Sequence, residues 1–253
     1  MKTAIVIPAR YASSRLPGKP LLRQTGKYLV QHVYEGACEA RCAAEVVVAT
    51  DDPRIVAAVR SFGGKVMLTR RDHPSGTDRV AEAARHLDAE VIINIQGDEP
   101  LVEPADLDLL PELLARDPAA DMATLAIPIT RLEDWRDPNR VKVVCDSRGR
   151  ALYFSRSPIP YVRDDEPQFA AQPHGFLQHL GLYAYRREFL QRLANEPPGR
   201  LEQMEKLEQL RALALGNPIQ VGIVHHASVS VDTLGDYELF VRQYRQSRKL
   251  QAA

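Results

Sequence analysis

The sequence predicts an α/β fold with a doubly wound, mostly parallel sheet. Short runs rich in valine and isoleucine are apolar throughout, which is typical of strands buried on both faces of a parallel sheet. They lie at 4–7, 45–50, 65–69 and 90–96. Helical patterns separate them, at 29–40, 53–62 and 77–87. This regular alternation of strands and helices indicates the doubly wound arrangement.

The rest of the chain predicts further strands and helices within a single domain, 1–253. Strand-like segments gather in the middle and favour a small β-rich subregion over about 130–190. They are 122–129, 141–146, 151–156 and 177–186, followed later by 219–224 and 229–233. Helices are expected at 104–116, 201–215 and 234–248. The proline-rich segment 157–175 is expected to be a long irregular loop, and such loops often serve as lids or interface elements.

Composition and motifs exclude several classes of protein. Lys plus Arg and Asp plus Glu both number 33, which argues against a protein that coats nucleic acid. No apolar run approaches the roughly 18 residues of a membrane span, and the first one is too short for a signal peptide. Three cysteines do not make a disulfide framework. The dinucleotide fingerprint, the P-loop and the nucleophile elbow are all absent. We therefore expect a cytoplasmic, soluble protein without a nucleic-acid or membrane partner.

The loop after the first strand carries three cations, Arg10, Arg15 and Lys19, and is stiffened by three prolines. Ligands of open α/β sheets bind at the carboxyl ends of the strands. Arginine and lysine are the side chains that bind phosphate oxygens. The loop therefore predicts a cradle for a triphosphate, with a solvated charged loop as the alternative.

Carboxylates follow another strand end. Asp98 and Glu99 come after the run 90–96 and Gly97. Carboxylates that face a cationic cradle are consistent with Mg²⁺, which takes one or two carboxylates together with substrate phosphates. Asp232 is a second candidate ligand, although it is also placed to cap the final helix.

A resemblance to a known family covers essentially the whole chain. It is carried by IPARYASSRLPGKPL, TRRDHPSGTDRVAEA, INIQGDEPLV, NRVKVVCD, ALYFSRSPIP, HLGLYAYR, LEQMEKLEQLRAL and VDT, in this order. Together these motifs resemble the CMP-KDO synthetase (3-deoxy-manno-octulosonate cytidylyltransferase) family. The opening motif alone resembles nucleotidyltransferases of the glycosyltransferase-A-like type. The resemblance implies that CTP and the sugar acid KDO (3-deoxy-D-manno-octulosonate) give CMP-KDO and diphosphate for lipopolysaccharide biosynthesis. It also implies a Mg²⁺ cofactor and a homodimer formed through the β-rich middle segment.

The resemblance assigns roles to the charged residues. Arg10, Arg15 and Lys19 would hold the triphosphate, with Lys19 at the α-phosphate, and Asp98 and Asp232 would bind Mg²⁺. Nucleotide contacts are implied for Pro8, Ala9, Arg10, Ser14, Arg15, Lys19, Arg71, Ser75, Gly76 and Gln96. The segment 70–79 is the candidate for base choice, and Ser75 or Thr77 can at the same time cap the helix that follows.

The sugar acid needs a cation for its carboxylate and several hydrogen-bonding groups. Arg156, expected at a strand end, is the candidate partner of the carboxylate. The candidate sugar-binding residues on the strand 177–186 share one face, since they alternate along it: His179, Tyr183 and Tyr185. Core packing is the alternative for the two tyrosines. Glu208 and Gln209 match the family motif, whereas the spacing of Glu202, Glu205 and Glu208 is also typical of a solvated helix face.

Other functions remain open at this stage. Arg156 would equally serve a cytidylyltransferase for 8-amino KDO or for a sialic acid, so the sequence does not separate KDO from its 8-amino analogue. The FSR and HLGLY motifs favour the KDO branch over a sialic acid. A glycosyltransferase commonly has a D-x-D motif at a strand end, which is absent here. A non-catalytic nucleotide-binding module would be expected to lack one of the two metal acids, yet both are present.

Overall fold

The structure is a computed structural model that describes residues 1–12, 16–163, 166–172, 174–226 and 230–251. The chain divides into two compact units. Unit 1 comprises Met1 and Leu109–Ala227, and unit 2 comprises Lys2–Asp108 and Ser228–Ala253. The β-rich subregion 130–190 lies within unit 1, and folding as a single domain stays a prediction. Among the described residues, no helix is both long and apolar enough to cross a bilayer.

Unit 2 is built on a parallel sheet. Its strands are β1 (Thr3–Ala9), β2 (Ala43–Thr50), β3 (Val66–Leu68) and β4 (Val91–Asn94), in the order β3-β2-β1-β4. Ile5 pairs with Val46 on one side and with Ile93 on the other, and all three are buried. The unalternated apolar runs of β1 and β4 are therefore strands covered on both faces, whereas β3, at the edge of the sheet, is partly exposed; the parallel sheet confirms the predicted fold class for this part of the chain.

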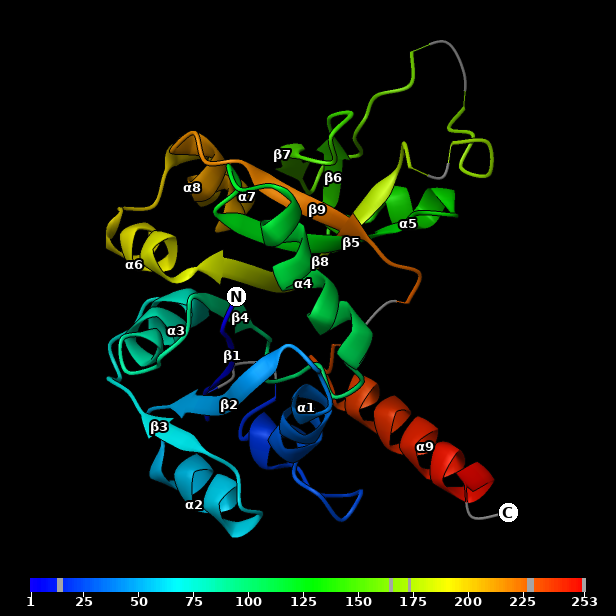
Figure 1. The fold of residues 1–253 in the computed structure, drawn as a ribbon. Coiled ribbons are helices and arrows are strands. Elements are labelled where there is room, and N and C mark those ends of the chain that lie inside the picture. Colours follow the sequence, from blue (N-terminus) through cyan, green and yellow to red (C-terminus); the bar gives the residue numbers. More distant parts are fainter. Residues whose placement is uncertain (13–15, 164–165, 173, 227–229, 252–253) are drawn as a thin grey trace. The chain divides into compact units, whose positions relative to one another are not determined.

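Helices connect these strands: α1 (Leu29–Cys38), α2 (Pro53–Ser61) and α3 (Gly76–Ala84), with a short 3-10 helix η1 (Lys19–Leu21) before α1 (Figure 1). Parallel crossovers are right-handed. The connections through α1 and α2 both move toward the β3 edge, whereas the connection through α3 returns past β1 to β4. This reversal places α3 on the opposite face, as a doubly wound sheet requires.

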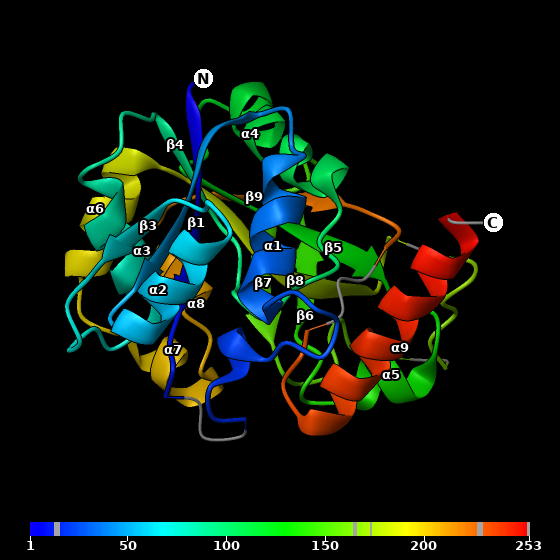
Figure 2. The ribbon, with the colours of Figure 1, turned by 90° about the horizontal axis from the view of Figure 1, so that it is seen from below.

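The C-terminal segment completes unit 2. Helix α9 (Leu234–Gln251), red in Figure 1 and Figure 2, packs against α1. Tyr237 and Phe240 of α9 share a buried cluster with Leu29 of α1 and with Val231, just before α9. Two parts of unit 2 that are separated in sequence by Leu109–Ala227 of unit 1 are thus held in one core.

A buried histidine joins α1 to α9. His32 is 7% exposed, and its ring meets those of Phe240 and Tyr244 edge-on, with centroids 5.0 and 4.6 Å away. Its Nε2 lies 2.7 Å from Thr25 Oγ1. Burial, assisted by the charge of Lys27 and opposed by that of Glu35, lowers the pKa of His32 to about 4.

We expect His32 to make unit 2 sensitive to acid. Because the pKa of His32 is lower in the folded protein than its ordinary value of 6.5, unfolding takes up a proton between the two values. The stabilisation from neutral His32 is complete above the higher value and is lost as the pH falls through the lower one. Between about pH 7 and pH 4, the parent should lose on the order of 2 kcal/mol more unfolding free energy than His32→Gln. Urea unfolding across this range measures the difference, and His86→Gln, which replaces an exposed histidine, should behave as the parent does.

Unit 1 has a mixed sheet centred on β5 (Met122–Pro128). β5 is antiparallel to β8 (Leu177–Arg186) and parallel to β9 (Ile219–Ile223). β6 (Lys142–Cys145) pairs antiparallel with both β7 (Ala151–Ser155) and β8. The helices are α4 (Pro104–Arg116), which starts in unit 2, α5 (Leu132–Arg136), α6 (Arg187–Asn195), α7 (Arg200–Glu205) and α8 (Gln209–Ala214).

Two of the predicted elements are wrong. The helix expected at 201–215 is two short helices, because Lys206 adopts a left-handed conformation (φ 55°) that ends α7. The strand expected at 229–233 is absent over 230–233, the part of it that the structure describes. The predicted irregular loop 157–175 has no helix or strand in its described residues, and Trp135 Nε1 anchors it by donating to the carbonyl oxygen of Ile159 at 3.0 Å.

Candidate active site

A lysine lies between two carboxylates in unit 2. Lys19 Nζ is 2.5 Å from Asp98 Oδ2 and 3.4 Å from Asp232 Oδ1. The Lys19 side chain is 11% exposed, and those of Asp98 and Asp232 are 22% and 35% exposed. The three groups that the sequence places near strand ends, in segments far apart along the chain, are therefore in direct contact.

Local backbone contacts bring the two acids together. A Cβ at Gly97 would lie 2.8 Å from the carbonyl oxygen of Pro8, so only glycine allows the chain after β4 to turn this close to β1. The turn presents Asp98, whose carbonyl oxygen accepts a hydrogen bond from Val231 N at 2.8 Å. That bond holds the segment carrying Asp232 beside the segment carrying Asp98.

The alternative role of Asp232, as the N-cap residue of the final helix or a residue next to the cap, holds only in its second form. Thr233 caps α9, because its Oγ1 accepts a hydrogen bond from Asp236 N at 3.2 Å. The Asp236 carboxylate in turn accepts from the backbone N–H groups of Thr233 and Asp232, at 2.8 and 3.1 Å. This reciprocal arrangement is a capping box. The Asp232 carboxylate is thereby left to face Lys19.

The donor set fits a divalent cation of the magnesium type. Two carboxylates from separate segments converge on one positively charged group, the Lys19 ammonium, as they would on a metal ion. The described residues contain no cluster of three or more His, Cys, Asp or Glu side chains suited to a metal. Mg²⁺ does not need one, because it commonly uses one or two protein carboxylates and completes its shell with phosphate and water. Metal binding by Asp98 and Asp232 stays a prediction.

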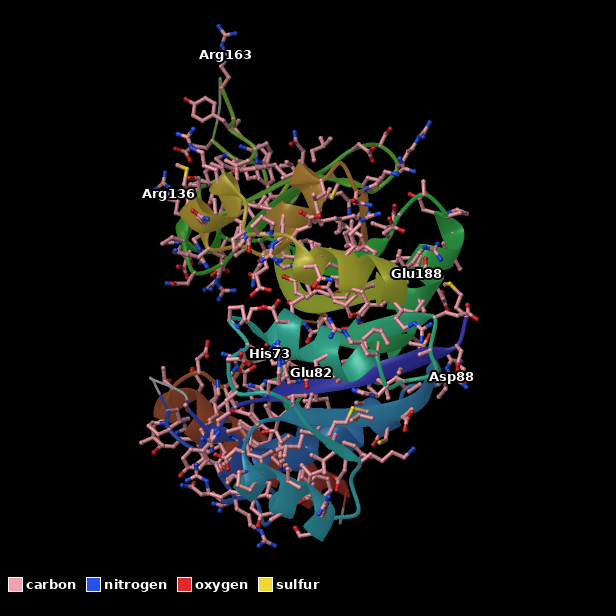
Figure 3. All side chains as sticks on the ribbon, turned by 90° about the vertical axis from the view of Figure 1, so that its left-hand side faces the viewer. His73, Glu82, Asp88, Arg136, Arg163 and Glu188 are labelled. Atoms are coloured by element: carbon pink, nitrogen blue, oxygen red, sulfur yellow. The ribbon has the colours of Figure 1, made fainter. Side chains whose placement is uncertain are left out.

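Arg10 holds the loop that precedes α3. Its Nη2 donates to the carbonyl oxygens of His73 and Ser75, at 2.9 and 2.6 Å. Ser75 caps α3, since its Oγ accepts from Asp78 N at 3.2 Å. His73, which points toward Glu82 in Figure 3, is hydrogen-bonded to that carboxylate. Arg10 thus joins the loop after β1, the candidate for phosphate binding, to the segment 70–79, the candidate for base choice. Its contact with a triphosphate stays a prediction.

Several of the other nucleotide-binding candidates are also close together. A Cβ at Gly76 would lie 3.6 Å from Pro8 Cγ and 4.0 Å from Gln96 Oε1, so these three residues are neighbours. Ala9 is buried at the end of β1, and Arg71 is exposed. Ser14 and Arg15 lie outside the described residues.

The sugar-binding candidates are in unit 1. On β8, the ring centroid of His179 is 5.4 Å from that of Tyr183, which is 5.9 Å from that of Tyr185. The shared face predicted from the alternation is therefore present, although Tyr185 is 2% exposed and also serves the core. Burial lowers the pKa of His179 to about 3, so its imidazole is neutral.

Arg156 follows β7 and is held by Glu205. Glu205 Oε2 accepts from Arg156 N at 2.9 Å, and the Glu205 carbonyl oxygen accepts from Arg156 Nε at 2.7 Å. Glu205 Oε1 accepts from Ser155 Oγ at 2.6 Å. The expectation that these glutamates form a solvated helix face is wrong for Glu205, and equally for Glu202, which is buried and paired with Arg211. The reason is that both carboxylates have partners outside α7, Arg211 for Glu202 and the Ser155–Arg156 segment for Glu205.

Gln209 carries a buried donor for which the described residues offer no acceptor. It is 3% exposed, and its Oε1 accepts from Tyr183 Oη at 3.3 Å. Its Nε2 has no hydrogen-bond partner among the residues the structure describes. Buried polar groups are nearly always satisfied, so an orphaned amide beside a tyrosine hydroxyl indicates a place for a polar ligand. Glu208, just before α8, is half-buried.

Sequence reasoning missed the residues that support the site. Thr124 bonds to His179, Lys142 binds the carbonyl oxygen of Arg156, and Glu205 holds the rest of Arg156. Each acts on a backbone group or on another side chain across strands. The only signal in the sequence is a polar residue within an otherwise apolar strand, at Thr124 and at Lys142.

Comparison with known proteins gives concordant results. A family model described as Cytidylyltransferase matches residues 4–219. A 3-deoxy-manno-octulosonate cytidylyltransferase from Syntrophobacter fumaroxidans is 53% identical over 244 residues, which cover 95% of this chain and 96% of the relative. Another, from Escherichia coli, is 50% identical over 232 residues, 92% of either chain. The solved structure of CMP:2-keto-3-deoxy-manno-octonic acid synthetase complexed with CTP is 47% identical, has a TM-score of 0.91, and covers 98% of this chain and 100% of that one.

The protein is an α/β nucleotidyltransferase. This class is defined by the parallel sheet, by the lysine–carboxylate cluster at its strand ends and by these matches. More narrowly, the chain belongs to the cytidylyltransferase family and, within it, to the 3-deoxy-manno-octulosonate cytidylyltransferases.

Proposed function

We propose that this protein activates KDO for lipopolysaccharide biosynthesis by transferring CMP from CTP. The hydroxyl oxygen on C2 of KDO bonds to the α-phosphorus, the bond from that phosphorus to the β-phosphate breaks, and diphosphate leaves. The observation that carries the proposal is the contact of Lys19 with both Asp98 and Asp232. It supplies opposite charges at the strand ends where a nucleotide binds on an α/β sheet.

The residues of unit 2 would act by position and charge. Phosphoryl transfer requires little covalent chemistry from the protein, so aligning and neutralising the triphosphate is the main task. Lys19 would meet the charge that develops at the α-phosphate, and Arg10 would keep the base loop against the phosphate loop. Mg²⁺, when held by Asp98 and Asp232, would neutralise and orient the phosphates and help to acidify the attacking hydroxyl.

The residues of unit 1 would bind the sugar acid. Arg156 would pair with the carboxylate, because its guanidinium is oriented by Glu205 at Nε and by the carbonyl oxygen of Pro138 at Nη1. Gln209 Nε2 would donate to a sugar oxygen, an acceptor that the described part of the chain does not provide. Tyr183 and His179 offer further polar atoms on the same face.

Diphosphate release tests the proposal directly. The purified protein is incubated with Mg²⁺, CTP and KDO, and parallel reactions replace CTP with UTP, or KDO with a sialic acid or with 8-amino KDO. Release with CTP and KDO alone supports the proposal. A preference for the 8-amino analogue retains the mechanism but changes the substrate. Failure to release diphosphate with every acid sugar contradicts the proposed activity.

We also propose that the protein is a homodimer that acts in the cytoplasm. The β-rich part of unit 1 exposes large apolar side chains, with Leu152 62% and Tyr161 82% exposed. A second copy of the chain would cover this surface. Light scattering that gives the mass of one chain would contradict the dimer.

A further inference from the structure

An irregularity in the sheet of unit 1 surrounds Thr124. Thr124 of β5 pairs with Tyr183 of β8, but the next residue, Leu125, pairs with Leu180. β8 therefore has two extra residues at this point, which form a bulge. Bulges commonly re-aim side chains next to functional sites. The Thr124 side chain is fully buried.

The Thr124 hydroxyl has three polar neighbours. Its Oγ1 lies 2.7 Å from the carbonyl oxygen of Leu182, 3.2 Å from that of Leu180 and 3.0 Å from His179 Nε2. Carbonyl oxygens only accept hydrogen bonds, and a hydroxyl has a single proton to donate. If Thr124 donated that proton to His179, its oxygen would face a carbonyl oxygen at 2.7 Å with no proton between them. The hydroxyl therefore donates to a carbonyl, and Nε2 of His179 donates to the hydroxyl.

The second ring nitrogen of His179 is then an acceptor. His179 is 8% exposed and is flanked by the rings of Phe154 and Tyr183, with centroids 5.0 and 5.4 Å away. A neutral imidazole has only one N–H group, and here it is used on Thr124. Nδ1 makes no hydrogen bond to the described part of the chain.

We propose that Thr124 and the bulge in β8 fix His179 as its Nε2–H tautomer, so that Nδ1 accepts a hydrogen bond from a hydroxyl group of the sugar acid. This inference rests on the proposed function. It makes Thr124 a positioning residue that acts through His179. A lone pair on Nδ1 repels a carboxylate and attracts a hydroxyl proton, whereas Arg156 attracts the carboxylate. The two residues together orient an acidic polyol in one direction.

Nitrogen-15 NMR of the ligand-free protein labelled at histidine tests the tautomer. Among the signals of the seven histidines, that of His179 is the one missing in His179→Gln. We expect a protonated Nε2 and an unprotonated Nδ1 in the parent and in Thr124→Ser. Valine has nearly the same shape as threonine but no hydroxyl, so in Thr124→Val the preference of His179 for the Nε2–H tautomer should be lost. A parent protein with a protonated Nδ1 would overturn the inference.

Kinetics provide the second measurement. Thr124→Val should raise KM for KDO about tenfold, as expected for the loss of one well-oriented hydrogen bond. It should leave KM for CTP near that of the parent, and Thr124→Ser should restore the parent value for KDO. Equal KM values for KDO in parent and Thr124→Val would refute the positioning role. The tautomer is measured without substrate, so a parent that shows the Nε2–H form yet releases no diphosphate would contradict the proposed function alone.

Discussion

Replacing Lys19 with methionine should lower kcat for diphosphate release by about a hundredfold to a thousandfold, the usual cost of removing one group that stabilises transition-state charge. Methionine retains the length and the apolar stem of lysine but has no charge. Asp98 and Asp232 would then converge without the ammonium that now lies 2.5 and 3.4 Å from them. The measurement is the initial rate of diphosphate release at saturating CTP and KDO.

Lys65→Met is the matched control. Lys65 is also in unit 2 and also pairs with a carboxylate, Glu45 at 2.8 Å, but its side chain is 63% exposed. Exposed pairs contribute little, so we expect this variant to keep the parent rate. If Lys19→Met retained at least a third of the parent kcat, Lys19 would have only a structural role.

Lys142→Met should lower the melting temperature by roughly 10 °C. Lys142 is fully buried, and its Nζ donates to the carbonyl oxygens of Asp137, Arg140 and Arg156 at 2.8, 2.6 and 2.6 Å. Burial lowers the pKa of Lys142, but three acceptors require three N–H groups, which only the ammonium form has. Methionine would leave all three carbonyls without a donor, at a total cost of about 3–5 kcal/mol.

The same substitution should also weaken the sugar site. The carbonyl of Arg156 is one of the three acceptors, so its release would loosen the guanidinium and raise KM for KDO more than KM for CTP. Circular dichroism during heating gives the melting temperature, with Lys65→Met again as the control. A melting temperature within about 2 °C of the parent would show that the carbonyls find other donors.

The predictable part of the fold follows from patterns that repeat along the chain. The residues of α4 and β8 were predicted with the bounds that the structure shows, because an opening proline and a long apolar strand pattern are strong local signals. Helix α6 was missed, and the break at Lys206 lies within an apolar stripe that continues on both sides. A left-handed lysine leaves no signature in the sequence, and the contacts of the neighbouring Glu205 with Ser155 and Arg156 join segments that are far apart along the chain.

The candidate site likewise has residues that the sequence predicts and residues that it does not. Lys19 and Asp98 were predicted to meet because parallel strands end at one edge of the sheet, and they do meet. The pairing of Asp98 with Asp232 followed from the family resemblance. Thr124, Lys142 and Glu205 were not predicted, since each binds backbone carbonyls or hydroxyls that only the folded strands bring within reach.

The discontinuity of unit 2 has a consequence for protein synthesis. Lys19 and Asp232 are 213 residues apart in sequence, and the bond from Val231 to Asp98 also awaits the end of the chain. A nascent polypeptide on the ribosome can fold the strands β1 to β4 and present Lys19 and Asp98 long before Asp232 is made. Asp232 is therefore the last of these residues to be synthesised, so we expect chains that are still too short to include it to release no diphosphate from CTP.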